Sequence, residues 1–213
     1  MDAMKKGPKI LIAIIVLVVF VTGIVGIKNQ FIISKDQLAA NITKATQNED
    51  GDLFLKQFDK DSQNLGFAKI GAQSVVEQWH NHASVPTAEV GKRITDGHTI
   101  AGPSVKYKFY VESKKVFGLF DSYYLAAKPT SVHFMTTDDT AKMRINITNG
   151  GKHIKATAQD FRNGLFPGKY SFHVDSPTED GRNQSGDFYV AVAGSENRFD
   201  MVLYFIDSDS EGE

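Results

Sequence analysis

His80 and His82 are the side chains whose type and spacing come nearest to a metal site. They stand two residues apart in the sequence Trp-His-Asn-His, and imidazole is a common ligand of zinc. The residues before them have helical periodicity, and side chains two positions apart on a helix point in nearly opposite directions. Pro86 ends the helical pattern. We therefore expect a structural role at a helix C-terminus, where a positive charge suits the helix dipole, and no metal site.

The acidic end of the chain imitates another metal motif. Asp207, Asp209 and Glu211 have the spacing that opens an EF-hand calcium loop, but such a loop needs a bidentate acid at its twelfth position. The sequence given ends at Glu213, so we expect residues 207–213 to form an acidic, disordered tail. Asp138 and Asp139 look like a turn rather than an acid–base pair.

Signatures of catalysis are missing from the sequence. It contains no G-x-S-x-G elbow, no H-E-x-x-H pair and no glycine-rich phosphate loop. The 213 residues include no cysteine, which removes thiol catalysis and cysteine-based metal sites. We expect a protein that is not an enzyme, with no catalytic, cofactor-binding or metal-binding residues.

One apolar stretch predicts where the protein lies. Residues 10–27 carry no charge, and as a helix they would span roughly 27 Å, close to the hydrocarbon thickness of a bilayer. Lys5, Lys6 and Lys9 precede this stretch, so residues 1–9 should be a cytoplasmic leader and everything after the span should be extracellular. The sequence thus predicts a single-pass transmembrane helix that acts as a signal-anchor.

A cleaved signal peptide is the alternative for this stretch. Its apolar part usually runs for about 7–15 residues and ends at small residues in an A-x-A pattern. Here the apolar run is longer, and Gly23 and Gly26 are embedded among Val and Ile. We therefore favour an uncleaved anchor.

Composition narrows the class of partner and of organism. The 24 basic and 25 acidic residues nearly balance, so no basic field argues for nucleic acid. Small exported eukaryotic domains often contain disulfides. The absence of cysteine therefore favours a bacterial cell surface, in particular a Gram-positive one.

The region after the anchor, residues 30–86, predicts a small helical domain. Ser34 and Gln37 have the spacing of a capping box that opens a helix toward Thr46. A second short helix is expected over 53–58 and a third over about 68–82. Residues 87–103 are polar and contain glycines, so we expect them to be a linker.

Past this linker the hydrophobic period changes from 3.6 to 2, which predicts strands over residues 104–206. Turn residues separate the runs and no segment predicts a long helix, so we expect an antiparallel β-sandwich-like domain. The alternating runs are Val105–Val111, Val132–Phe134, Met143–Ile147, Tyr170–Val174, Phe188–Val192 and Phe199–Phe205.

Two stretches of this β-rich domain are distinctive. In Gly164–Tyr170, Pro167 and Gly168 suit the corners of a type II turn in which Gly168 has a positive φ, while Leu165 and Phe166 fold beneath it. The second stretch crowds four aromatic residues together: Phe117, Phe120, Tyr123 and Tyr124. We expect most of these four in the core, and an interface if three are exposed side by side.

Taken in order, these segments resemble a known family. The resemblance covers the chain from the anchor to about Phe205, and it is carried by FLKQFDKD (54–61), VKYKFYV (105–111), FGLFDSYY (117–124) and GLFPGKY (164–170). The chain is similar to TcaA-type membrane proteins of Gram-positive bacteria, which are linked to teicoplanin susceptibility and often carry a cytoplasmic zinc ribbon. Here only nine residues precede the anchor and no cysteine is present, so the zinc ribbon is not expected.

The resemblance implies a non-enzymatic protein at the boundary between membrane and cell wall. It implies a membrane-anchored extracytoplasmic binding or scaffold protein of the cell envelope, with a role in the response to cell-wall antibiotics. Its expected partners are membrane lipid, through the N-terminal helix, and peptidoglycan or an envelope protein. Two alternatives stay open: a hydrolase acting on wall polymers, and an envelope stress sensor or regulator.

Overall fold

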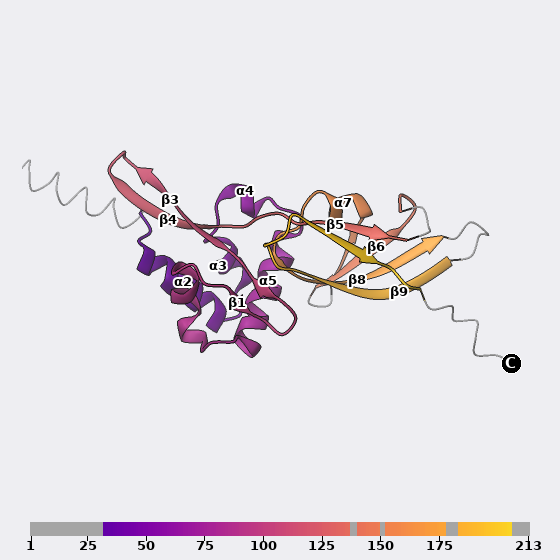
Figure 1. The fold of residues 1–213 in the computed structure, drawn as a ribbon, viewed down its shortest axis with the longest axis horizontal. Helices are drawn as coiled ribbons and strands as arrows, with labels where there is room; N and C mark the ends of the chain where they lie inside the picture. The colour runs from indigo at the N-terminus through magenta and orange to yellow at the C-terminus, as the bar shows by residue number, and fades with distance from the viewer. Residues whose placement is uncertain (1–31, 137–139, 150–151, 178–182, 206–213) are drawn as a thin grey trace, which may run out of the picture.

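The computed structural model of the chain describes residues 32–136, 140–149, 152–177 and 183–205 (Figure 1). The leader 1–9, the predicted transmembrane helix 10–27, the Asp138–Asp139 turn and the acidic tail 207–213 lie outside these residues. Within the described ranges, none of the helices has the length and apolarity that crossing a bilayer requires. Helices come first in the chain and strands follow, as the sequence predicts.

The first helices form where the sequence signals them. Ser34 caps α2 through a complete capping box, in which its hydroxyl accepts from the Gln37 amide at 3.1 Å and its own amide donates to Gln37 Oε1 at 2.9 Å. The helices after it pack their apolar sides around Phe54 and Trp79, whose rings meet edge to face at 5.5 Å. The bounds are α2 (Lys35–Gln47), α3 (Gly51–Leu55), α4 (Lys60–Gln63) and α5 (Ala68–His82).

The segment 87–103, which we expected to be a linker, is built into the helical unit. It contains a 3₁₀ turn η1 (Thr87–Glu89), the helix α6 (Val90–Thr95) and the short strand β1 (Ile100–Ala101). Val90 and Ile94 are one helical turn apart and both are buried in the first core. Gly91 lets α6 approach α2 so closely that an added Cβ would lie 1.9 Å from the Ala39 carbonyl oxygen.

The first strands also belong to this unit, so the boundary that we expected at residue 104 is not a boundary between cores. The strands are β2 (Lys106–Tyr107), β3 (Tyr110–Val116) and β4 (Phe120–Ala126), of which β3 and β4 form an antiparallel hairpin. Tyr107, Phe109 and Leu125 are buried in the same cluster as Trp79 and Phe54. The helices contribute few large apolar residues, and residues of the strands thus complete the first core.

The second unit is a four-stranded antiparallel sheet with a separate pair of strands. The sheet has the order β7-β6-β8-β9, and α7 (Ala158–Arg162) lies beside it. The strands are β5 (Ser131–Met135), β6 (Arg144–Asn149), β7 (Lys152–Ala156), β8 (Gly168–Pro177), β9 (Asn183–Val192) and β10 (Arg198–Val202).

The separate pair differs from the antiparallel arrangement that we expected. β5 and β10 pair in parallel. Phe134 of β5 contacts Phe172 of β8, with ring centroids 5.7 Å apart, so the pair packs against one face of the sheet. A second core of apolar residues fills this space.

The segment Gly164–Tyr170 joins the two units. Leu165 and Phe166 are both fully buried as predicted, Leu165 in the second core and Phe166 in the first. The predicted positive φ at Gly168 is wrong: Gly164 has a φ of 100° instead, and Gly168 begins β8. Gly168 is needed for a close approach, since an added Cβ would lie 2.4 Å from the Gly71 Cα of α5.

Candidate functional site

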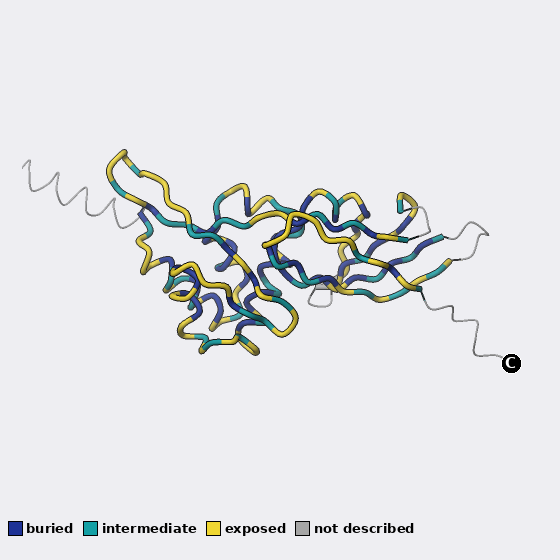
Figure 2. The backbone as a smooth tube through the Cα atoms, viewed as in Figure 1, coloured by how far each residue is buried: buried dark blue, intermediate teal, exposed yellow. Residues whose placement is uncertain are grey.

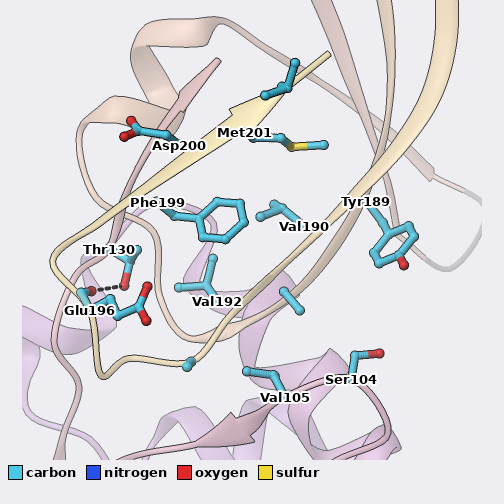
Figure 3. Close-up of a pocket in the computed structure, with 13 residues that line it drawn as sticks. Ser104, Val105, Thr130, Tyr189, Val190, Val192, Glu196, Phe199, Asp200 and Met201 are labelled. Atoms are coloured by element: carbon cyan, nitrogen blue, oxygen red, sulfur yellow. Dashed lines mark hydrogen bonds between the residues drawn. The ribbon is translucent and has the colours of Figure 1, made fainter. Parts of the chain in front are cut away.

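A hollow with a volume of about 560 Å³ lies between β9 and β10 (Figure 3). Ligand sites in proteins commonly measure about 300–1,000 Å³. We call it the β9–β10 groove. Its lining residues are Ser104, Val105, Thr130, Tyr189, Val190, Ala191, Val192, Ala193, Glu196, Phe199, Asp200, Met201 and Val202.

The groove exists because two neighbouring strands do not pair with each other. β9 is the last strand of the four-stranded sheet and pairs with β8, whereas β10 pairs with β5. Among the described residues no strand ladder joins β9 to β10. Each strand therefore turns an edge of backbone N–H and C=O groups toward the same space.

The turn after β9 directs β10 away from β9. The Ala193 carbonyl accepts from the Lys108 amide at 2.9 Å, and the Asn197 carbonyl accepts from the Ser131 amide at 2.9 Å. The Thr130 hydroxyl donates to the Glu196 carbonyl at 2.5 Å, the bond drawn in Figure 3. These bonds hold the turn against β5 and against the segment before β3. β10 therefore runs beside β5 and not beside β9.

Apolar side chains make up most of the groove. Val190 and Val192 are buried and form its floor, and the ring of Phe199 lies over the space in front of them (Figure 3). Phe199 is 39% exposed and Tyr189 is 62% exposed. An aromatic ring from each strand thus remains accessible beside a buried aliphatic floor.

The polar side chains are few and lie at the ends. Asp200 accepts from the Arg198 guanidinium at 2.8 Å and points away from the floor in Figure 3. Glu196 lies at the end of the groove near Thr130, with its carboxylate exposed. The strand edges therefore supply most of the hydrogen-bonding capacity of the groove, with one carboxylate at one end.

A polar surface adjoins the groove across β9. The Lys169 ammonium lies 5.0 Å from the centre of the Tyr189 ring. Further along the same face, His173 Nδ1 lies 2.8 Å from Asp187 Oδ1, and His173 Nε2 lies 3.4 Å from Asp175 Oδ1. The hydrogen bond to Asp187 raises the pKa of His173, and the charges of Asp175 and Asp187 act in the same direction.

The histidines that the sequence singled out do not form a site. α5 is a regular helix through His80 and His82, which places them on different sides of it. His80 Nδ1 lies 3.2 Å from the Thr46 carbonyl and its Nε2 lies 3.5 Å from Glu49 Oε1, so this side chain ties α5 to the end of α2. Nowhere in the described ranges do three His, Asp or Glu side chains gather to hold a metal ion.

The expectation that most of the crowded aromatic residues are core is wrong. Phe117 is exposed, and Phe120, Tyr123 and Tyr124 are only half-buried on the hairpin β3–β4. The condition for an interface, three of the four exposed side by side, is not met either. An exposed Leu119, two residues from Phe117, was not among the candidates.

Sequence reasoning did not find the groove. The alternation at Phe188, Val190 and Val192 predicts β9, but strand order is not a local property and the parallel pairing of β10 gives no local signal. The sequence contains one signal of the groove: Tyr189 is a large aromatic residue on the solvent-facing side of a predicted strand. Comparison of the chain with protein-family models, with curated proteins and with solved structures finds no match.

Proposed function

We propose that this chain is a membrane-anchored, extracytoplasmic binding or scaffold protein of the cell envelope, and that its β9–β10 groove holds an extended peptide segment of its partner. The observation that carries this proposal is that the edges of β9 and β10, which no ladder joins in the described part of the chain, face each other across an apolar floor. Addition of a peptide strand to an exposed sheet edge is a recurring mode of peptide recognition.

The groove suits a particular kind of peptide. Main-chain bonds to a strand edge give affinity, and alternate side chains of the peptide enter the pockets beneath. The floor of Val190 and Val192 favours apolar residues at those alternate positions. Glu196 at one end favours a basic residue or an amino terminus there.

The proposed location of the protein is supported by its sequence. Residues 10–27 supply the predicted membrane anchor with the N-terminus in the cytoplasm, and the resemblance to TcaA-type proteins supports a Gram-positive envelope. We also propose that the β5–β10 pair and the four-stranded sheet form a sandwich-like domain, which the contact between Phe134 and Phe172 supports. In this arrangement the groove lies along an open seam between the two layers.

A peptide-binding measurement tests the proposal. The full chain in detergent is used to select peptides from a random library, and their dissociation constants are measured by fluorescence anisotropy. We expect selected peptides to alternate apolar residues and to lose at least tenfold in affinity when alternate backbone nitrogens are methylated, because each methyl group removes a main-chain donor. Methylation without effect would contradict strand addition.

A pair of matched variants locates the binding. Phe199→Asp places a charge beside the apolar floor, and we expect it to weaken binding at least tenfold. Tyr204→Asp makes a similar change at a side chain that is 79% exposed and does not line the groove, and binding should persist. Equal effects of the two substitutions would place the peptide elsewhere.

A further inference from the structure

The hairpin β3–β4 ends in an exposed apolar turn. It projects past the helices at the end of the molecule where α2 begins (Figure 1), and Figure 2 shows its end as exposed. We call residues Phe117, Gly118 and Leu119, which connect Val116 to its partner Phe120, the hairpin tip. Phe117 is 67% exposed and Leu119 is 75% exposed.

The residue types at the tip are not those that favour the backbone conformation of the turn. Phe117 has a φ of 53° and Gly118 a φ of 71°, a backbone region that Gly and Asn occupy with little strain and a bulky residue does not. Phe117 and Leu119 gain almost no burial from the fold in return. The unfavourable backbone and the exposed apolar side chains together motivate the search for a contact outside the chain.

Two hydrogen bonds limit the distance that can separate the tip from the predicted membrane span. The Ile33 amide donates to Ser122 Oγ at 3.0 Å, and the Tyr123 amide donates to the Ile33 carbonyl at 2.9 Å. Ile33 is therefore fixed to β4, a few residues from the tip, or roughly 10–13 Å along an extended strand. Ile33 comes six positions after Ile27, the end of the predicted span, and a chain of that length can reach at most about 22 Å.

The side chains behind the tip suit a bilayer surface. Lys114 and Lys115 are exposed on β3, where Asp121 lies 3.0 Å from the Lys115 ammonium. The exposed Glu112 lies farther from the tip and accepts from the Tyr124 hydroxyl at 3.3 Å. The Lys114 ammonium lies 6.0 Å from the centre of the Tyr124 ring. Tyrosine is enriched where proteins meet lipid headgroups, and a lysine suits the same layer because its apolar stem can lie in the bilayer while its ammonium stays in water.

We propose that the hairpin tip inserts Phe117 and Leu119 into the interfacial layer of the bilayer that holds residues 10–27. This inference rests on the membrane anchoring in the proposed function. Anchor and tip together would give the chain two points of attachment, which fix its orientation on the membrane. The β9–β10 groove then stands away from the bilayer, because β9 lies toward the other end of the long axis (Figure 1).

The absence of cysteine allows a direct test on the full chain. Leu119→Cys, labelled with a polarity-sensitive fluorophore, is reconstituted in vesicles of phosphatidylcholine and phosphatidylglycerol that contain a headgroup nitroxide quencher. A second labelled chain, Ser195→Cys in the exposed turn after β9, serves as the matched control. We expect quenching at position 119 to exceed that at position 195 at least threefold.

A second substitution tests the role of the neighbouring ring. Phe117→Ser in the Leu119→Cys background removes one of the two apolar contacts, and we expect quenching at position 119 to fall by half or more. Equal quenching at positions 119 and 195 would overturn the inference. Shielding of the fluorophore that grows with the protein-to-lipid ratio would assign the tip to a second copy of the chain and would also overturn it.

Flotation of the same vesicles tests the proposed membrane anchoring separately from the contact of the hairpin tip with lipid. If the chain floats with the vesicles and position 119 is not quenched, the anchoring stands and the contact of the tip with lipid is wrong. If the chain does not float with the vesicles, the anchoring fails, and the inference fails with it.

Discussion

Gly168, the first residue of β8, lies against Gly71 of α5 so closely that a Cβ added to Gly168 would be 2.4 Å from the Gly71 Cα. A Cβ added to Gly71 would in turn lie 2.5 Å from the Tyr170 hydroxyl oxygen and 2.9 Å from the Pro167 carbonyl oxygen. Real Cβ atoms do not approach other atoms this closely. The two glycines therefore allow the helical unit and the four-stranded sheet to pack into one body.

Alanine at either glycine should force the two units apart. We expect Gly71→Ala and Gly168→Ala each to lower the free energy of unfolding by about 1–3 kcal/mol, the usual effect of overpacking, as measured by urea denaturation. Gly186→Ala on β9 is the control, because its Cβ would meet the half-exposed ring of Phe188 at 3.1 Å and Phe205 at 3.7 Å and no backbone atom that closely, and a change below about 1 kcal/mol is expected. Similar values for all three variants would show that the contact does not constrain the joint.

The hydroxyl of Tyr170 should stabilise the same joint. It donates to the Phe166 carbonyl at 2.5 Å, and burial raises the pKa of Tyr170 well above its usual value. Tyr170→Phe leaves this carbonyl without that donor, so we expect a loss of about 1–3 kcal/mol in the free energy of unfolding. Tyr189→Phe removes a hydroxyl from an exposed ring and should have no effect. Equal stability of the two variants would contradict the role of the hydrogen bond.

His173 should make stability depend on pH. Its pKa is raised in the folded chain by the Asp187 carboxylate, so the pairing stabilises the fold below the unfolded pKa of about 6.5 and is lost as pH rises through the folded pKa. We expect Asp187→Asn to lower the His173 pKa in an NMR titration and to destabilise the chain at pH 5.5 but not at pH 9. Asp121→Asn, on the hairpin, is the control. If it lowered the His173 pKa as much as Asp187→Asn does, a specific effect of Asp187 would be excluded.

Local signals in the sequence predicted the elements that depend on local physics. The capping pair Ser34 and Gln37, the periodicity of 68–82 and the alternation that gives β8 and β9 each predicted an element that the structure contains. α6 was missed because Val90 and Ile94 are the only large apolar residues among the six of this helix, which lies in a polar segment. β4 was missed because its aromatic residues crowd both faces and hide the alternation.

Features that depend on distant residues could not be predicted. The close approach of Gly71 and Gly168 requires knowing that α5 meets β8, and a glycine beside Pro167 suggested a turn more strongly than a contact. The groove requires knowing that β10 pairs with Ser131–Met135 rather than with β9. The alternation in β9 could suggest an exposed Tyr189, but only the strand order shows that the edges of β9 and β10, unjoined among the described residues, face each other beside it.

The most direct test of the peptide-binding groove is hydrogen exchange at the amides of β9, measured residue by residue by NMR. Because β9 pairs with β8 and with no other strand of the described residues, we expect every second amide between Ser185 and Val192 to exchange fast in the free chain and the intervening amides to exchange slowly. Addition of a selected peptide should then protect the fast set. Slow exchange of both sets in the free chain, or a fast set that a bound peptide leaves unprotected, would contradict strand addition in the β9–β10 groove.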